Sequence, residues 1–256
     1  MGKTIAITNQ KGGVGKTTTA VNLSASLAEA GQRVLLIDFD SQANATTGLL
    51  AGEEIHKKTI YDLICENCTA EECVIPNVID GLDLIPADIN LAGAEAEFQD
   101  LDHMEDMLRN AISSLKQKYQ YILIDCPPSL SVLTLNALTA ADSVIIPIQC
   151  EYYALEGLNQ VLNTIYLVKR KLNPQIKIEG VLFTMYDQRT NLSEQVVESV
   201  KQNLKEPIYE TIIPRNVKLA EAPSYGEPII IYDSNSRGAE SYRLLAAEMM
   251  SKEEKC

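Results

Sequence analysis

Residues 11–18 read Lys-Gly-Gly-Val-Gly-Lys-Thr-Thr and stand between an apolar segment, residues 4–8, and a helical pattern that begins at about Thr17. Glycines at this spacing let backbone N–H groups close around phosphate oxygens, and the amino terminus of the following helix favours negative charge. The segment therefore predicts a phosphate-binding loop between the first strand and the first helix of an α/β fold. A plain glycine turn is the minor alternative.

Each part of this loop has an expected task toward bound ATP. The Lys16 ammonium is expected to hold the β- and γ-phosphates, and the Thr17 hydroxyl to help bind Mg²⁺. The general P-loop pattern requires glycine at position 10, where this chain has Gln10, and a second lysine, Lys11, begins the loop instead. The predicted cradle is completed by Gly12, Gly13, Val14, Gly15 and Thr18.

The rest of the chain alternates apolar strands with helical stretches. Residues 34–37 form a continuous apolar run, typical of a strand buried on both faces. Alternation of this kind predicts a single P-loop NTPase domain over residues 1–256, with a mainly parallel, twisted sheet and helices on both faces. Further strands are expected at 82–85, 121–124, 144–148, 178–183 and 229–232, and helices near 17–30, 101–118, 154–171, 191–203 and 238–250.

Acidic residues follow two of the expected strands. Asp38 and Asp40 come directly after residues 34–37, and Asp125 follows residues 121–124. Acids at the carboxyl ends of parallel strands point into the crevice where ligands bind in open α/β sheets. Beside a phosphate-binding loop they predict a site for Mg²⁺ and ATP, whereas the plainer alternative is that each acid caps its own loop.

Charge and hydropathy narrow the class of protein. The net charge of −13 argues against a nucleic-acid partner for the chain as a whole. However, residues 1–164 hold 9 Lys and Arg against 22 Asp and Glu, while residues 165–250 hold 11 of each and can present a local basic face. No apolar run approaches the about 20 residues of a membrane span, and the start of the chain does not resemble a signal peptide. We expect a cytoplasmic protein.

Six cysteines fit a reducing compartment better than a disulfide framework. Cys65 and Cys68 form a Cys-x-x-Cys pair, and Cys73 is near in sequence. A structural zinc site needs four ligands, and His56 is the nearest histidine. We therefore expect free thiols on a surface helix or loop, with zinc as the less favoured alternative.

The loop matches the deviant Walker A motif, so the chain resembles the deviant-Walker ATPases, which include ParA/Soj, MinD and nitrogenase iron protein. The resemblance to ParA/Soj extends over the whole chain and is carried by residues 38–48, 124–130 and 213–229. It differs from the commonest ParA form at Ser41, where Pro is usual, and at Ala43, where Gly is usual. Both positions lie beside Asp40, so the differences concern how fast the loop around Asp40 switches and do not affect the assignment to the family.

This resemblance implies roles for individual residues. The nucleotide lies between two subunits of an ATP-dependent homodimer, and Lys11 reaches the phosphates of the partner subunit. Asp40 orients and activates the attacking water, Asp125 holds Mg²⁺ through water, and Asp38 lies near the metal shell. Pro214 and Asn216 contact adenine, and residues 223–226 form a loop near the nucleotide.

Partners are implied in the same way. ParA/Soj proteins bind nonspecific double-stranded DNA on the nucleoid as ATP dimers, and a ParB-type partner stimulates hydrolysis. Phosphate contacts require a cluster of cations, although each such side chain can equally be an ordinary solvated one. The expected DNA contacts are Arg189, Arg215 and Lys218, with Lys201, Lys205 and Arg243 as weaker candidates.

A MinD-like, membrane-associated positioning ATPase is the alternative function. MinD is expected to end in a basic amphipathic helix. In this chain the two Lys and two Glu at positions 252–255 cancel, so the tail is not basic and membrane binding is disfavoured. Iron–sulfur relatives need bridging cysteines at the dimer interface, and Cys65 and Cys68 lie in a different region.

Overall fold

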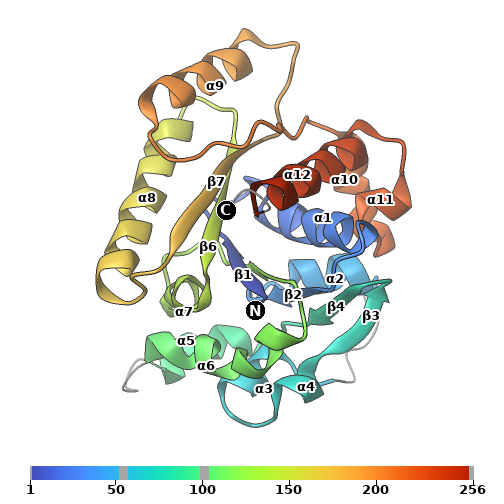
Figure 1. Ribbon diagram of the computed structural model, residues 1–256, viewed down its shortest axis with the longest axis vertical. Coiled ribbons are helices and arrows are strands. Elements are labelled where there is room, and N and C mark those ends of the chain that lie inside the picture. The colour runs from blue at the N-terminus through green and yellow to red at the C-terminus, as the bar shows by residue number, and fades with distance from the viewer. Residues whose placement is uncertain (1, 52–56, 99–103, 254–256) are drawn as a thin grey trace.

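The computed structural model describes residues 2–51, 57–98 and 104–253 (Figure 1). Within these ranges the centre of the molecule is a seven-stranded sheet with the order β3-β4-β2-β5-β1-β6-β7. Six strands run parallel, and β3 pairs antiparallel with β4 at one edge. The strands are β1 Lys3–Ile7, β2 Val34–Asp38, β3 Ile75–Ile79, β4 Leu82–Ile85, β5 Tyr121–Asp125, β6 Ser143–Gln149 and β7 Lys177–Thr184.

Successive side chains of each central strand pack in hydrophobic cores on opposite faces of the sheet, because side chains alternate along a strand. In β2, Val34 and Leu36 pack in the core covered by α1 (Lys16–Glu29) and α12 (Arg237–Glu253). Leu35 and Ile37 pack on the opposite face, in the core covered by α7 (Val132–Ala140) and α8 (Ala154–Lys171). Figure 1 shows α1 and α12 side by side. The predicted α/β fold, with a mainly parallel sheet and helices on both faces, is confirmed.

Most of the long helices lie where their periodicity predicts them. The stretch near 101–118 is different, because from Met104 to Gln117 it is a 3₁₀ turn, the short helix α6 and a second 3₁₀ turn, and residues 101–103 lie outside the described ranges. Across the described ranges, no helix has both the length and the apolar character needed to cross a bilayer. The remaining α-helices are α2 Asn44–Leu50, α3 Ile60–Ile64, α4 Ala70–Cys73, α5 Leu91–Glu97, α6 Met107–Ala111, α9 Asn191–Asn203, α10 Val217–Glu221 and α11 Ile229–Tyr232.

The strand predicted at 229–232 is wrong, because this segment is the single helical turn α11. Its first N–H, from Ile229, donates to Asn22 Oδ1 of α1 at 2.7 Å, and the N–H of Tyr232 donates back to the Pro228 carbonyl at 3.0 Å. Ile229 and Ile230 are buried under α1 and α12, whereas Ile231 is exposed. Four apolar residues in a row do not separate a strand from a buried helical turn.

Gly180 in β7 has no room for a side chain. A Cβ at this position would lie 2.7 Å from two ring carbons of Tyr209, whose side chain is fully buried. We expect Gly180→Ala to lower the free energy of unfolding by roughly 1–3 kcal/mol, because the ring must shift inside a packed core.

Gly157→Ala in α8 is the matched control, since no heavy atom outside its own helix turn lies within 4 Å of the added Cβ. Alanine favours a helix interior over glycine by about 1 kcal/mol, so this variant should be at least as stable as the parent chain. Urea denaturation of both variants checks the pair, and equal stability of the two would contradict the expectation.

Candidate functional site

The carboxyl ends of three central strands bring the predicted site together. The register of the parallel sheet pairs Asp38 of β2 with Asp125 of β5, and Asp125 with Ile7 of β1. The glycine-rich loop leaves β1 at this level and passes directly into α1, which begins at Lys16. Residues that are more than 100 positions apart in the sequence therefore share one edge of the sheet.

The loop has the backbone conformation that its glycines predict. Gly13 has a φ of 72° and Gly15 a φ of 86°, both in the left-handed region that a side chain disfavours. Gly15 is the last residue before α1, whose first N–H groups have no partner within the helix. A loop of this shape, ending at a helix amino terminus, is suited to bind an anion.

Two polar residues that the sequence interpretation missed tie the loop to the neighbouring strands. Asn9 donates from Nδ2 to the Pro147 carbonyl of β6 at 2.7 Å and accepts at Oδ1 from the N–H of Lys11 at 3.0 Å. Thr184, at the end of β7, donates from Oγ1 to the Val14 carbonyl at 2.8 Å. Their signal was a polar residue at a strand end, the same signal that identified the acids.

The two lysines of the loop point in different directions. Lys16 is 7% exposed, and its Nζ donates to the backbone carbonyl of Lys11 at 3.2 Å. Burial lowers the pKa of Lys16, while the carboxylate of Asp125 acts in the opposite direction. Lys11 instead places its Nζ 2.9 Å from Glu151 Oε2, with both side chains partly exposed. Lys16 thus faces the interior of the site and Lys11 lies on its rim.

Asp125 is the one carboxylate of the site that is fully buried with no hydrogen-bond partner for either oxygen among the described residues. Burial and the neighbouring Asp38 raise the pKa of Asp125 well above its usual range, against a smaller lowering by the Thr17 hydroxyl. Two unpaired buried carboxylate oxygens are costly in the absence of a cation. An oxygen ligand with free lone pairs beside a hydroxyl fits the donors that Mg²⁺ prefers.

Asp38 is equally buried but its oxygens are occupied. Its Oδ2 accepts from both the N–H and the Oγ1 of Thr46 at 2.8 Å, and its Oδ1 accepts from the N–H of Asp40 at 3.2 Å. Burial raises the pKa of Asp38 to about 6 despite these bonds. Thr46 also accepts from the N–H of Ala87 at 3.0 Å. Asp38 therefore anchors residues 40–46 as well as facing the site, and Thr46 was not predicted to take part.

Asp40 and Ala43 lie in the segment between β2 and α2. Asp40 is 7% exposed, and its Oδ1 accepts from the N–H of Gln42 at 3.0 Å. Ala43 has a φ of 52°, in the left-handed region. For a residue with a Cβ this conformation costs about 1–2 kcal/mol, which explains physically why glycine suits this position.

Two of the predicted DNA contacts, Arg189 and Arg215, lie in or against the loop that follows β7. The guanidinium of Arg189 forms a fork with Asp187, at 2.9 Å from Nε and 2.7 Å from Nη2. The N–H of Arg215 donates to the Tyr186 carbonyl at 2.9 Å. Arg189, with a smaller contribution from Arg215, holds the pKa of Asp187 well below its usual range. Lys218 lies in the adjacent α10 with its Nζ 2.8 Å from Glu221 Oε2.

The predicted adenine contacts flank Arg215. Pro214 forms an isolated parallel β-bridge with Tyr186. Asn216 caps α10, because its Oδ1 accepts from the N–H of Lys218 at 2.8 Å. In addition, Pro223 lines a pocket of about 290 Å³ with Thr17, at the phosphate end of α1, and with residues of α2. Pro223, in the 3₁₀ turn Ala222–Tyr225, therefore lies beside the start of α1.

The weaker basic candidates differ in their surroundings. Arg243 donates to Glu29 from Nε at 2.6 Å and from Nη2 at 2.8 Å, and to the Ser234 carbonyl from Nη1 at 2.6 Å, so it ties α12 to α1. Lys201 is exposed in the last turn of α9, and Lys205 is exposed just after this helix.

The cysteine group is a further candidate for metal binding. Cys65, Cys68 and Cys73 carry free thiols. Over residues 2–51, 57–98 and 104–253, no three His, Cys, Asp or Glu side chains are placed to hold a metal ion on their own. His56 lies outside the described residues.

Known proteins resemble this chain over almost its whole length. A family model described as an AAA domain matches residues 2–178. The sporulation initiation inhibitor protein Soj of Bacillus subtilis (strain 168) is 56% identical over 249 residues, or 97% of this chain and 98% of that protein. The chromosome partitioning protein ParA of Myxococcus xanthus (strain DK1622) is 52% identical over 253 residues, or 99% and 89%.

A solved structure has the same fold. The crystal structure of cobyrinic acid a,c-diamide synthase from Mycobacterium smegmatis, with bound ADP and magnesium, superposes with a TM-score of 0.87 at 37% identity and covers 99% of this chain and 96% of that one.

Lys16→Ala should weaken ATP binding by roughly a hundredfold, because it removes a buried ammonium that can donate charge-assisted hydrogen bonds to phosphate. Equilibrium dialysis with labelled ATP measures the effect. Lys11→Ala is the control, since Lys11 Nζ lies on Glu151 at the rim, and it should leave the affinity of the monomer nearly unchanged. Retained ATP affinity in Lys16→Ala would contradict the phosphate-binding role.

The stability of the metal-free chain should depend on pH through Asp38. Since burial raises its pKa from 3.8 to about 6, Asp38 contributes stability that is fully present below about pH 4 and is lost as the pH rises through about 6. Asp38→Asn keeps an acceptor for Thr46 but cannot ionise.

Urea denaturation with a chelator present, between about pH 4 and pH 7, compares the two proteins. The parent chain should lose up to roughly 3 kcal/mol more stability over this range than Asp38→Asn. Parallel pH profiles would show that Asp38 does not titrate in this way.

Proposed function

This chain belongs to the ParA/Soj family of chromosome-partitioning P-loop ATPases, and on that basis we propose that it is an ATP-dependent partitioning switch. Two copies close around ATP, the ATP dimer binds double-stranded DNA without sequence preference, and slow Mg²⁺-dependent hydrolysis, stimulated by a ParB-type partner, releases it. Identity is higher to Soj and ParA than to the structure named as a diamide synthase, which favours partitioning over amide synthesis.

The placement of the two lysines carries this proposal. Lys16 already occupies the interior of its own loop, whereas Lys11 Nζ lies on the rim against a partly exposed carboxylate. A rim lysine is free to serve phosphates presented by a second copy of the chain. Positive charge that arrives only on dimerisation would couple assembly to hydrolysis, as an arginine finger does.

Each residue of the site has a separate proposed role toward ATP and Mg²⁺. The loop amides and Lys16 bind the β- and γ-phosphates, and Pro214 and Asn216 contact the adenine. Thr17 and Asp125 hold Mg²⁺, which neutralises phosphate charge. Asp38 fixes the position of residues 40–46, the switch segment, through Thr46, and Asp40 orients the attacking water. The unpaired oxygens of Asp125 and the left-handed glycines of the loop support this assignment.

DNA binding is assigned to Arg189, Arg215 and Lys218. In the monomer, Arg189 is paired with Asp187 and Lys218 with Glu221, so a single copy presents little net positive charge here. Dimerisation doubles the number of cations that can face one duplex. Contacts of this kind reach phosphates only, which predicts affinity that falls steeply with salt.

A MinD-like membrane ATPase is less well supported. The helix α12 uses Ala239, Leu245 and Met249 to cover α1 and the sheet, so this apolar surface is already buried in the core. The last three residues of the tail, 254–256, lie outside the described part of the chain.

Duplex-DNA binding by Asp40→Ala tests the proposed switch. Removing the water-orienting carboxylate should trap the ATP dimer, so this variant should bind DNA of any sequence with ATP, and not with ADP or without nucleotide. Affinity should fall by at least tenfold between low and moderate salt, as expected for several phosphate contacts. Fluorescence anisotropy with labelled duplexes gives all of these values.

Gly12→Val combined with Asp40→Ala is the control. A Cβ at Gly12 meets nothing within 4 Å in one copy of the chain, so ATP binding should survive while the larger side chain blocks close approach of a second copy. This double variant should not bind DNA. DNA binding that does not depend on ATP, or binding to anionic liposomes in its place, would count against the partitioning switch.

A further inference from the structure

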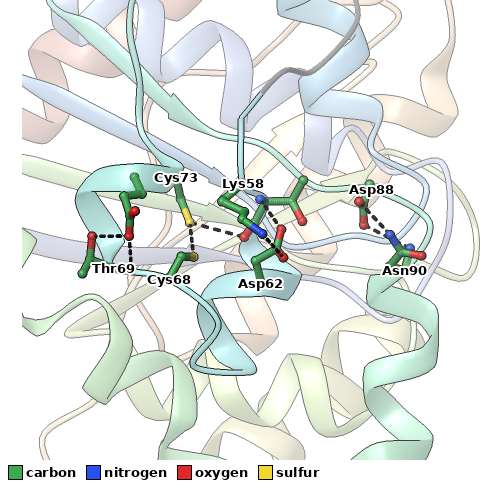
Figure 2. A network of polar contacts seen from close by, with 9 residues as sticks. Lys58, Asp62, Cys68, Thr69, Cys73, Asp88 and Asn90 are labelled. Atoms are coloured by element: carbon green, nitrogen blue, oxygen red, sulfur yellow. Dashed lines mark hydrogen bonds and ion pairs between the residues drawn. The ribbon is translucent and has the colours of Figure 1, made fainter.

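The cysteine group seen in the sequence takes no part in the site described above. Cys68 lies in the turn before α4 and Cys73 is the last residue of this helix, and their Sγ atoms are 3.2 Å apart (Figure 2). Cys68 is partly exposed, whereas Cys73 is completely buried. We propose that these two cysteines form a redox-active dithiol, which a low-molecular-weight disulfide converts reversibly to an intramolecular disulfide.

The local structure holds the two sulfur atoms together. Thr69 is the N-cap residue of α4, and its N–H and Oγ1 both donate to Glu72 Oε2, at 2.8 Å and 2.9 Å. This capping box fixes the single helical turn that separates Cys68 from Cys73. On the other side, the Cys73 thiol donates to the Thr59 carbonyl at 3.4 Å. A disulfide needs a sulfur–sulfur distance of about 2 Å, so a small side-chain rotation brings the pair into bonding range.

The two thiols have different parts in the exchange. The partly exposed Cys68 thiolate attacks one sulfur of the small disulfide, forms a mixed disulfide and releases one small thiolate, which is protonated. The Cys73 thiolate then attacks Cys68 Sγ and releases the second small thiol. Two protein thiols are oxidised by two electrons, the small disulfide is reduced to two thiols, and the two thiol protons end on these products.

The second step requires ionisation of the buried Cys73 thiol. Burial raises the pKa of Cys73, and the carboxylates of Asp62 and Glu72 act in the same direction; in the fully reduced pair the adjacent Cys68 thiol raises it further. Because only the thiolate attacks, ring closure should accelerate as the pH rises. Figure 2 shows Asp62 close to the pair, where it also binds Lys58.

The dithiol lies near the support of the switch segment. Thr59, which accepts from Cys73, is followed by Ile60, whose N–H donates to the Pro86 carbonyl at 2.9 Å. Ala87, which follows Pro86, donates its N–H to Thr46 Oγ1, and this hydroxyl donates to Asp38. Oxidation removes the thiol proton that Cys73 gives to Thr59, at the first of these contacts.

Oxidised glutathione applied to the reduced full-length chain tests the inference. After acid quenching and denaturation, the number of alkylatable thiols should fall from six to four, and the tryptic peptide 59–109 should lose two hydrogens. Dithiothreitol should restore all six. A mixed disulfide that persists on Cys68, or an unchanged thiol count, would overturn the assignment.

Single substitutions identify the pair. Cys65→Ser is the matched control, since Cys65 is the third thiol of the group, and this variant should still lose two thiols. Cys68→Ser, at a partly exposed turn position, should lose none, and Cys73→Ala gives an independent second test. A disulfide that survives in Cys68→Ser, or disappears in Cys65→Ser, would show that a different pair reacts.

Discussion

The burial of two carboxylates at neighbouring strand ends is the constraint around which the rest of the site is arranged. Parallel pairing puts Asp38 and Asp125 opposite each other and out of contact with water. The protein compensates Asp38 with three hydrogen bonds from residues 40–46, whereas the compensation of Asp125 comes from the Thr17 hydroxyl and the charge of Lys16. An asymmetric pair of this kind has one member to organise the chain and one to bind a cation.

The fold was largely readable from the sequence because strands buried on both faces leave continuous apolar runs, as residues 34–37 do. Residues 229–232 show the limit of this signal, since packing under α1 decides that such a short run is helical. The acids and the loop were predicted by their position at strand ends. Thr46 was missed because its hydrogen bonds to Asp38 depend on how the segment between β2 and α2 folds back on the strand end. Thr184 stands at a strand end, but its bond to the Val14 carbonyl joins positions 170 apart in the sequence.

The lysines and arginines proposed to contact a second copy of the chain or DNA are held by ion pairs at the surface. Lys11 with Glu151, Arg189 with Asp187, and Lys218 with Glu221 all involve partly or largely exposed groups. Exposed pairs contribute only about 0–1 kcal/mol, so a phosphate can replace the carboxylate at little cost. These pairs keep flexible cations ordered and nearly neutral in one copy of the chain, and leave them available to a stronger anion.

The raised pKa of Asp38, about 6, has a thermodynamic consequence for any ligand that favours its ionised form. Near neutral pH a fraction of the free chains carries a proton on this carboxylate, and a cation bound beside it expels that proton. The solution must then take the proton up. The heat of nucleotide binding measured by calorimetry will therefore contain the ionisation enthalpy of the buffer, and the apparent binding enthalpy will differ between phosphate and Tris at the same pH.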